Sequence, residues 1–280
     1  METAGRHTEA LSINPVLAKK ILIDFIRDET HNVGFKKGIV GLSGGVDSAV
    51  ALFLAAAALG KENVLAVLMP YRTSSPESLS DARLAAAEAG VATEVVEITP
   101  MVDAYLTRLS ITEKVRAGNV MARQRMIVLY DMSSRENALV IGTSNKTEIL
   151  LGYGTLFGDM ACAINPLGDL YKTQIFELAE ALSVPRGIIG KKPSADLWEG
   201  QTDEGEFGFS YENVDRLLFQ MIDERRTDVE LRDLGHEAEF IARVRKIVQK
   251  NQFKRRPALI AKVSNRTFNI DFRYARDWGT

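Results

Sequence analysis

The sequence predicts an α/β fold in which helices cover both faces of a parallel β-sheet. Two observations lead to this fold class. Short apolar runs alternate along the chain with longer segments whose apolar residues recur at helical spacing. Proline or glycine stands at the ends of several of these segments, where it starts or stops a helix. Because parallel strands need long connections, the alternation favours strands joined by right-handed helical crossovers.

The first half of the chain contains the strands of the predicted sheet. Residues 15–32 form an amphipathic helix that begins at a proline, and residues 37–43 form a buried strand. Residues 47–60 form a helix that is buried on most faces and ends at Gly60. The other predicted elements here are strands at residues 63–70, 92–98 and 138–143 and helices at residues 75–90 and 118–137.

The pattern changes after Leu151. Residues 152–169 hold too many glycines and turn residues for a regular element, and residues 170–183 form a helix. Residues 191–210 form a long polar loop, a kind of segment that tends to be functional or disordered. We expect residues 197–209 to close over bound substrates. The last predicted elements are a helix that Ser210 caps at residues 211–223, a helix at residues 236–250 and an irregular tail at residues 253–280.

Composition limits the function classes. The chain has 280 residues, 46% of them hydrophobic, and we expect residues 1–280 to form a single domain. A net charge of −2, from 35 basic and 37 acidic residues, gives no general cationic field, so no nucleic-acid partner is expected despite the local "KRR" at Lys254. The single cysteine, Cys162, excludes an intramolecular disulfide and a multi-cysteine zinc site.

No N-terminal signal with an apolar core is visible. The longest apolar run, residues 49–59, is too short to span a bilayer. We therefore expect a cytoplasmic protein without a membrane partner.

The loop "SGGVDS", Ser43 to Ser48, lies between a predicted strand and a predicted helix. Its backbone N–H groups and the positive helix end can bind an anion, and its glycines let phosphate oxygens approach. No lysine follows, in contrast to Walker-type loops, and Asp47 stands in the turn. A carboxylate in an anion site requires a divalent cation, so we expect Mg²⁺ to hold pyrophosphate here while the α-phosphorus of ATP is attacked. The competing interpretation is a tight turn in which Asp47 only caps the helix.

Three polar segments follow the ends of predicted strands: "SGGVDS", "MPYRTS" at residues 69–74 and "IGTSNKTE" at residues 141–148. Ligands on open α/β sheets bind beyond the carboxyl ends of the strands. The three segments are therefore expected along one rim of the sheet.

The loop "SGGVDS" resembles the pyrophosphate loop of the N-type ATP pyrophosphatases, which include NAD, GMP and asparagine synthetases and several tRNA-modifying enzymes. Four further segments, in order, resemble ammonia-dependent NAD synthetases and extend the likeness over nearly the whole chain: "GNVMARQRM", "IGTSNKTE", "LYKTQ" and "KPSADLWEGQTDEGEFGFSY". The resemblance implies a Rossmann-like sheet of the adenine nucleotide alpha-hydrolase-like type. It also implies ATP-dependent amidation of deamido-NAD by ammonia, through an adenylated intermediate, with release of AMP and pyrophosphate.

The resemblance implies roles for individual residues around ATP. Asp47 and Glu148 would bind Mg²⁺, and Lys172 would contact the ATP phosphates and assist catalysis. Thr143 would also contact ATP, as would Ser194, which replaces a threonine usual in the family. The loop residues of the implied ATP site are Gly41, Leu42, Ser43, Gly44, Gly45, Val46, Asp47 and Ser48. By residue type alone, Glu148 equally fits a solvated helix position and Thr143 an N-cap.

For deamido-NAD the resemblance implies contacts from Arg123 and from Lys254 in "FKRRP". At the other implied substrate positions the chain departs from the family pattern: Phe253 replaces a histidine, Leu156 a lysine and Ala163 an aspartate. Asp159 matches the carboxylate proposed to take a proton from incoming ammonia, and its residue type equally fits a turn.

Free ammonia is the predicted nitrogen source, because the chain lacks the length for the amidase domain of glutamine-dependent versions. Leu156 and Ala163 keep open a related ligase with a different acceptor. A nucleotide-binding regulator without turnover is the other alternative. Against it stands the intact set Asp47, Glu148, Lys172 and Asp159.

The resemblance further implies a homodimer with the dinucleotide at the subunit interface. Residues 118–134 form part of a long predicted helix that is rich in methionine, arginine and tyrosine, which are enriched at interfaces. We therefore expect a two-fold dimer in which this helix pairs with its symmetry mate. The residues expected at this interface are Met121, Arg125, Met126, Leu129 and Tyr130.

Overall fold

The computed structural model describes residues 11–194, 196, 198 and 200–267, and its sheet confirms the predicted fold class. Four parallel strands in this part of the chain lie in the order β3-β2-β1-β4. In the register of the sheet, Ile39 pairs with Leu65 on one side and Val140 on the other. The strands are β1 (Lys37–Gly41), β2 (Val64–Leu68), β3 (Ala92–Val95) and β4 (Ala138–Ile141).

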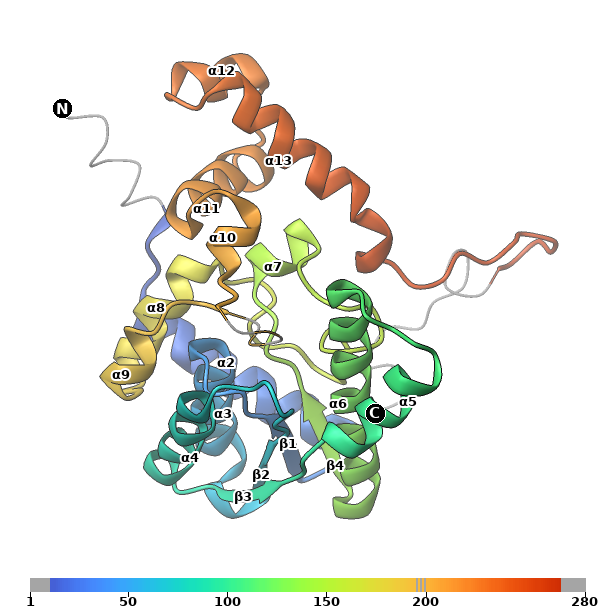
Figure 1. Ribbon diagram of the computed structural model, residues 1–280. Coiled ribbons are helices and arrows are strands. Elements are labelled where there is room, and N and C mark those ends of the chain that lie inside the picture. The colour runs from blue at the N-terminus through green and yellow to red at the C-terminus, as the bar shows by residue number, and fades with distance from the viewer. Residues whose placement is uncertain (1–10, 195, 197, 199, 268–280) are drawn as a thin grey trace.

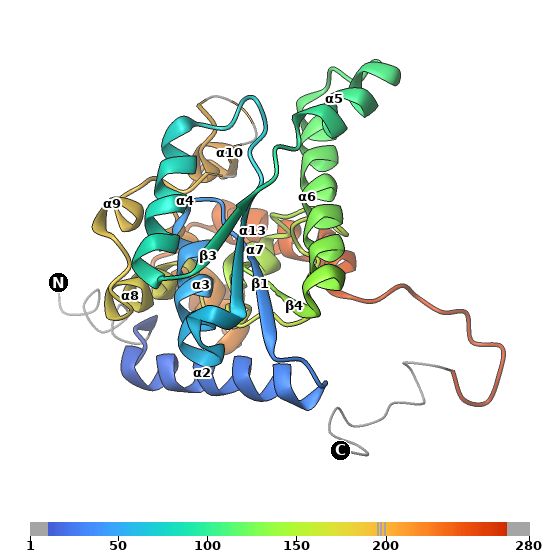
Figure 2. The ribbon, with the colours of Figure 1, turned by 90° about the horizontal axis from the view of Figure 1, so that it is seen from below.

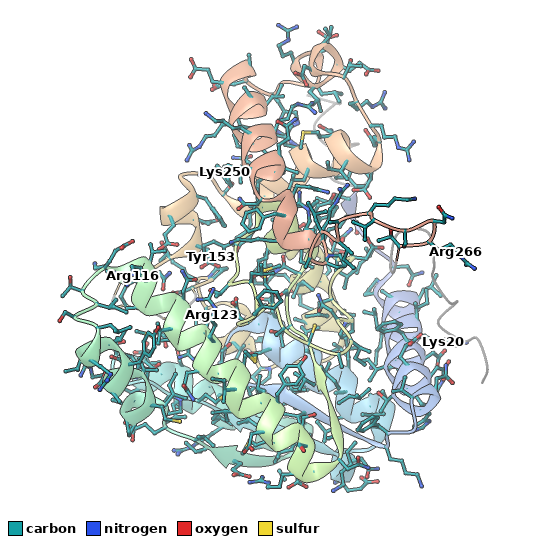
Figure 3. All side chains as sticks on the ribbon, turned by 90° about the vertical axis from the view of Figure 1, so that its right-hand side faces the viewer. Lys20, Arg116, Arg123, Tyr153, Lys250 and Arg266 are labelled. Atoms are coloured by element: carbon teal, nitrogen blue, oxygen red, sulfur yellow. The ribbon has the colours of Figure 1, made fainter. Side chains whose placement is uncertain are left out.

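Helices cover both faces of the sheet (Figures 1 and 2). One face is covered by α2 (Pro15–Asn32), α3 (Val46–Leu59), α4 (Pro76–Ala89), α8 (Lys172–Ala181) and α9 (Arg186–Ile189), and the short η1 (Lys61–Asn63) precedes β2. The other face is covered by α5 (Thr99–Arg108) and α6 (Lys114–Glu136). Figure 3 views the molecule from the α6 side, where the exposed Arg116 and Arg123 project from that helix.

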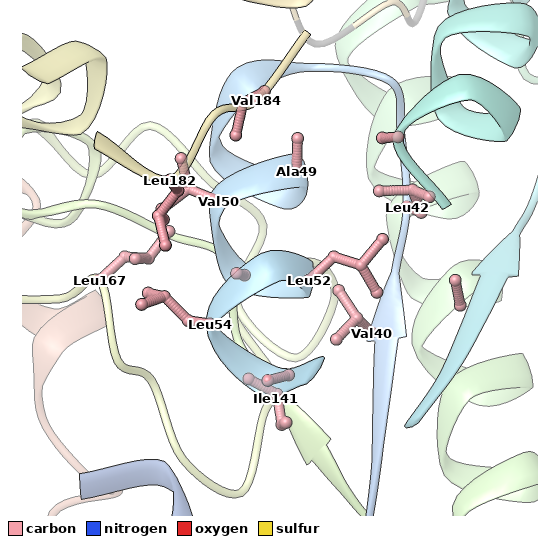
Figure 4. Close-up of a cluster of buried hydrophobic side chains, with 14 of the residues drawn as sticks. Val40, Leu42, Ala49, Val50, Leu52, Leu54, Ile141, Leu167, Leu182 and Val184 are labelled. Carbon is pink, nitrogen blue, oxygen red and sulfur yellow. The ribbon is translucent and has the colours of Figure 1, made fainter. Parts of the chain in front are cut away.

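The core lies on both faces of the sheet, which explains the continuous apolar runs of the central strands. Val40 of β1 and Leu52 of α3 are fully buried on the first face (Figure 4). Ile39 of β1 packs on the second face with Val102 of α5 and Met132 of α6. A strand that is buried on both faces needs apolar residues at successive positions, as parallel sheets generally do.

A helical lobe lies beyond the carboxyl ends of the strands (Figure 1). Its elements are α7 (Lys146–Leu151), α10 (Asp203–Phe207), α11 (Tyr211–Leu218), the π-helical η2 (Phe219–Asp223), α12 (Asp228–Asp233), α13 (Ala238–Lys250) and η3 (Gln252–Arg255). The lobe has its own buried cluster, which includes Leu151, Val214 and Ile241. Within the described residues, no helix is long and apolar enough to cross a membrane.

Most predicted elements are confirmed, and several helix ends follow the predicted caps. Gly60 ends α3 with φ 85°, and the Ser210 side chain accepts a hydrogen bond from the backbone N of Asn213. The helix α5 was not predicted, and α6 begins at Lys114 instead of residue 118. The loop at residues 191–210 contains the short helix α10. Leu197 and residues 268–280 of the predicted tail lie outside the described residues.

Candidate active site

A cleft of about 900 Å³ opens at the carboxyl ends of the strands. Residues from all three polar rim segments line it, including Ser43, Ser74 and Thr143. The prediction that the segments meet along one rim is therefore confirmed.

The two glycines of the loop have different surroundings. Gly44 has φ 85°, and a Cβ there would stand 2.2 Å from the backbone oxygen of Ser78 on α4, so close packing of the loop on α4 requires glycine. A Cβ on Gly45 would meet only the Ser43 hydroxyl at 3.5 Å. Gly45 lines the cleft and Gly44 is not among its lining residues, so only Gly45 leaves space for a ligand as predicted.

Two serines close the loop on itself. The backbone N of Ser43 donates to the Ser48 Oγ at 3.2 Å, and the Ser48 hydroxyl donates to the Gly45 carbonyl at 3.0 Å. Gly45 is the N-cap of α3 and provides no side-chain cap. The first turn of α3 thus presents backbone N–H groups to the cleft, where an anion would be stabilised.

Asp47, Glu148 and Lys172 come together on the floor of the cleft. The Lys172 ammonium forms an ion pair with Asp47, and its Nζ lies 4.0 Å from the Glu148 Oε1. Asn145 donates from Nδ2 to the Asp47 Oδ1 at 2.9 Å and caps α7 through a reciprocal pair of bonds with Glu148. Glu148 is thus an early helix residue, yet its side chain is only 18% exposed, so the solvated interpretation does not hold.

The charges at this centre do not balance. Burial, followed by the neighbouring Asp47, raises the pKa of Glu148 well above its usual value. Burial alone would lower the pKa of Lys172. The Asp47 and Glu148 carboxylates outweigh this effect and raise the pKa above its usual value, so the ammonium stays charged. Asp203 adds a nearby carboxylate, and burial raises the pKa of that group too. One lysine therefore faces an excess of buried carboxylates.

This donor set fits Mg²⁺. Within the described residues, no group of three or more His, Cys, Asp or Glu side chains could hold a metal ion by itself. Mg²⁺ commonly takes only one or two carboxylates and completes its shell with water and substrate phosphates. The oxygens of Asp47 and Glu148 would be the protein ligands, and a divalent cation would offset the charge that raises the pKa of Glu148.

The polar loop borders the mouth of the cleft and contacts α4. Lys191 donates to the Ser78 Oγ at 3.1 Å and to the Asp81 Oδ2 at 2.8 Å. Asp196 accepts a hydrogen bond from the backbone N of Ser75 at 3.1 Å. Ser194, predicted to bind ATP, lines the cleft.

Lys254 and Asp159 also line the cleft, at its helical-lobe end. The Lys254 ammonium donates to the carbonyls of Gly152 and Gly154, both at 2.7 Å, and burial lowers its pKa. The Asp159 Oδ1 accepts from the backbone N of Thr155 at 2.7 Å. The surrounding protein raises the pKa of Asp159, because its desolvation outweighs the backbone hydrogen bonds and the nearby cations.

The other predicted substrate residues lie outside the described lining of the cleft. Arg123 is exposed on α6 and its Nη2 lies 3.4 Å from the Leu156 carbonyl. Phe253 is 60% exposed on η3. The backbone N of Ala163 donates to the Val140 carbonyl at 2.9 Å, so that residue extends the edge of the sheet. A single chain does not bring these four residues together with Asp47, Glu148 and Lys172, which we call the ATP-side group.

Most of the α6 residues that we expected at a dimer interface lie instead in the core or in the cleft. Met121 is buried in the core, and Arg125, Met126 and Leu129 line the cleft, so these residues are not on the outer surface; Tyr130 is 41% exposed. Arg125 is a cleft residue that the sequence analysis missed. Its Nε donates to the Met69 carbonyl at 3.2 Å, and burial lowers its pKa. Its helical spacing with other lining residues, Gly118, Ala122 and Leu129, was the available signal.

The parallel sheet and the cleft of about 900 Å³ at its carboxyl edge define an α/β nucleotide-binding enzyme. The model of the NAD synthase family matches residues 18–258. The chain therefore belongs to the NAD synthase family.

Known proteins agree over nearly the full length. The NH(3)-dependent NAD(+) synthetase of Chlorobium phaeobacteroides (strain BS1) is 57% identical over 272 residues, which is 97% of this chain and 98% of the relative. The structure of NMN synthetase from Francisella tularensis is similar with a TM-score of 0.80 at 34% identity, over 89% of this chain and 99% of that one. The NH3-dependent NAD synthetase of Campylobacter jejuni, in complex with the nitrate ion, has a TM-score of 0.77 at 36% identity, over 89% of this chain and 100% of that one.

Proposed function

We propose that the protein is an NH3-dependent NAD synthetase, a ligase that amidates deamido-NAD with ammonia and ATP. The observation that carries this function is the 57% identity with an NH(3)-dependent NAD(+) synthetase over nearly the whole of both chains. The cleft supports it, since ATP-phosphate chemistry needs the cationic and carboxylate groups that line its floor.

In the first step, a nicotinate carboxylate oxygen of deamido-NAD attacks the α-phosphorus of ATP. A C–O–P anhydride bond forms, the bond from the α-phosphorus to the bridging oxygen breaks, and pyrophosphate leaves. The first turn of α3 would bind the departing phosphates, and Lys172 would neutralise their charge. Asp47 and Glu148 would hold Mg²⁺, which supplies further charge neutralisation when bound.

In the second step, ammonia attacks the carbonyl carbon of the adenylate and AMP leaves. The nitrogen must lose a proton, and Asp159 would accept it. Its raised pKa and its place in the cleft support this role, since a base is more effective when its pKa is near the working pH. Lys254 lines the same end of the cleft.

The test uses purified protein with Mg²⁺, ATP, deamido-NAD and an ammonium salt. The expected products are NAD, AMP and pyrophosphate in equal amounts, with no ADP. Glutamine in place of ammonium should give no NAD. Formation of ADP, or turnover that does not depend on deamido-NAD or a related acceptor, would exclude this function.

A mononucleotide acceptor is the second candidate. One solved relative is an NMN synthetase. Phe253, Leu156 and Ala163 are apolar here, so they cannot form ion pairs with the second nucleotide of a deamido-NAD molecule. The assay should therefore compare deamido-NAD with its mononucleotide counterpart, and the larger kcat/KM identifies the acceptor.

We also propose a homodimer through the outer side of α6. That side carries Arg123, together with Ile127 at 53% exposure and Tyr130 at 41%. Exposed isoleucine and tyrosine beside arginine match the composition of interface cores. Such an interface would bring Arg123 of each chain near the seam and account for its distance from the ATP-side group.

A further inference from the structure

A buried carboxylate lies close to the reaction centre, by which we mean Asp47, Glu148 and Lys172, but is not among the residues that line the cleft. Asp215 belongs to α11 in the helical lobe and is 0% exposed. Its Oδ1 accepts from the Thr147 hydroxyl at 2.6 Å. Its Oδ2 accepts from the backbone N and the hydroxyl of Thr173, at 2.8 Å and 3.0 Å. Both oxygens of one carboxylate are thus engaged with two threonines.

Each threonine is next to a residue of the reaction centre. Thr147 precedes Glu148 on α7, and Thr173 follows Lys172 at the start of α8. The Thr147 Oγ1 also accepts from the backbone N of Lys172 at 3.0 Å, which joins the two helix starts directly. Asp215 therefore binds the first turns of the two helices that carry Glu148 and Lys172.

The charge of Asp215 suits this place. The N-cap residue of α8, Tyr171, provides no side-chain acceptor for the first N–H groups of the helix. Asp215 and Thr147 supply those acceptors from other elements, and a negative charge at the positive end of α8 is favourable. Burial raises the pKa of Asp215, while the threonine bonds and the Lys172 charge oppose that shift.

We propose that Asp215 is a positioning residue of the amidation reaction, which fixes the Lys172 ammonium relative to Asp47 and Glu148 through Thr147 and Thr173. The inference rests on the proposed roles of Lys172 and Glu148. A purely architectural role would require only that α11 stay packed on the lobe. A positioning role requires in addition that the two helix starts keep their relative place.

The test compares Asp215→Asn with Val214→Ala in the full-length protein. Val214 is its buried neighbour on α11 and belongs to the lobe core, so its truncation weakens the same helix without touching the threonines. Asp215→Asn should lower kcat and the calorimetric affinity for ATP with Mg²⁺, each by about 10- to 100-fold, as buried partners of ligand-holding residues typically do. Val214→Ala should lower the melting temperature and leave both quantities within about twofold of wild type.

A second pair of variants keeps the inference testable if Asp215→Asn does not fold. Thr147→Val removes the bridging hydroxyl and should reproduce the loss, while Thr147→Ser keeps the hydroxyl and should restore most of it. Equal kcat and ATP affinity in Thr147→Val and Thr147→Ser, or unchanged values in a folded Asp215→Asn, would overturn the inference.

Lys172→Met separates this inference from the proposed function. If Lys172→Met loses turnover and Asp215→Asn does not, only the positioning role fails. If Lys172→Met retains wild-type turnover, the proposed role of Lys172 itself is wrong.

Discussion

At the scale of single residues, the two carboxylates beside Lys172 have different surroundings in the free protein. Asp47 is paired with Lys172 and bonded by Asn145, whereas the pKa of Glu148 is raised by burial and by Asp47. The two side chains should therefore respond differently to neutralisation.

Asp47→Asn should leave the fold intact and reduce pyrophosphate release by at least about 100-fold, the typical scale for loss of a group that stabilises charge in the transition state. A neutral amide cannot hold Mg²⁺ against pyrophosphate. The measurement is pyrophosphate release with ATP, Mg²⁺ and deamido-NAD, with the exposed Asp28→Asn on α2 as the control. Near-normal release by a folded Asp47→Asn protein would remove the metal assignment.

Glu148→Gln should stabilise the free protein and impair catalysis. The raised pKa means that the folded state disfavours ionised Glu148, so its ionisation costs stability as pH rises from the unfolded pKa through the folded pKa. Glutamine stays neutral and can still accept the bond from Asn145. We expect a melting temperature at pH 7 higher by about 2 °C or more, the shift that corresponds to about 1 kcal/mol in a large domain.

The gain from Glu148→Gln should shrink at pH 5, where wild-type Glu148 is closer to its neutral form. Scanning calorimetry without ligands at both pH values measures this difference. A gain that is the same at both values would show that the ionisation of Glu148 is not its cause.

At the scale of elements, α10 is held by tyrosines from two other segments. The Asp203 carboxylate accepts from Tyr211 at 2.8 Å and from Tyr153 at 3.0 Å, and the Tyr153 hydroxyl lies 2.9 Å from Glu206. Asp203 and Glu206 belong to α10 and line the cleft. The polar loop is thus fixed at its α10 end.

Tyr153→Phe should loosen α10 over the cleft. Loss of the Tyr153 hydroxyl, whose single proton is shared between Asp203 and Glu206, should raise the KM for ATP about fivefold, which is the effect of about 1 kcal/mol. Proteolytic cleavage at residues 197–209 should become faster and should slow again with saturating ATP and deamido-NAD. The exposed Tyr105→Phe on α5, at 51% exposure in the wild type, is the matched control. Cleavage that ligands do not slow would contradict closure of this loop.

The sequence predicted the helices and strands better than it predicted what each side of a helix contacts. The central strands are short continuous apolar runs and α3 is a longer apolar segment, and glycine or polar turns follow them, so their patterns are unambiguous. The helix α5 has few buried residues, chiefly Val102 and Leu106, and its amphipathic signal is short. On α6 the periodicity located Met126 and Leu129 correctly on one face, but a partner subunit and a cleft both accept methionine and leucine. Only the folded chain distinguishes these neighbours.

The site was predictable to the extent that motifs adjoin strand ends. Asp47, Thr143 and Glu148 meet in the cleft because the carboxyl ends of parallel strands share one edge. Asp215 could not be predicted as their support, since an aspartate within an amphipathic helix normally indicates a solvated face. Its burial depends on α11 packing across two helix starts that lie far away in the sequence.

At the scale of the whole molecule, the outer side of α6 determines the expected assembly. Ile127→Glu places a charge on this side and should weaken dimer association by at least about tenfold, since buried interface anchors typically contribute more than 1 kcal/mol. Sedimentation at micromolar concentration measures the dimer fraction. Val16→Glu on α2, at 76% exposure in the wild type, should leave it unchanged. A wild-type chain that is monomeric and fully active would rule out the shared-site dimer.

Gly44 packs on α4 and Gly45 does not, so we expect selection for folding at Gly44 and selection for ligand binding at Gly45. Any side chain at Gly44 collides with the backbone of Ser78, so a descendant that had lost all turnover would still have to keep this glycine in order to fold. Gly45 has open space, and only a bound ligand would exclude a side chain there. The test is a library of all substitutions at Gly44 and Gly45, sorted once for folded protein and once for growth that depends on NAD synthesis. Substitutions of Gly44 should be lost in both sorts. Substitutions of Gly45 should be lost only in the sort for growth. The requirement for folding thus constrains Gly44, whereas the requirement for a bound ligand constrains Gly45.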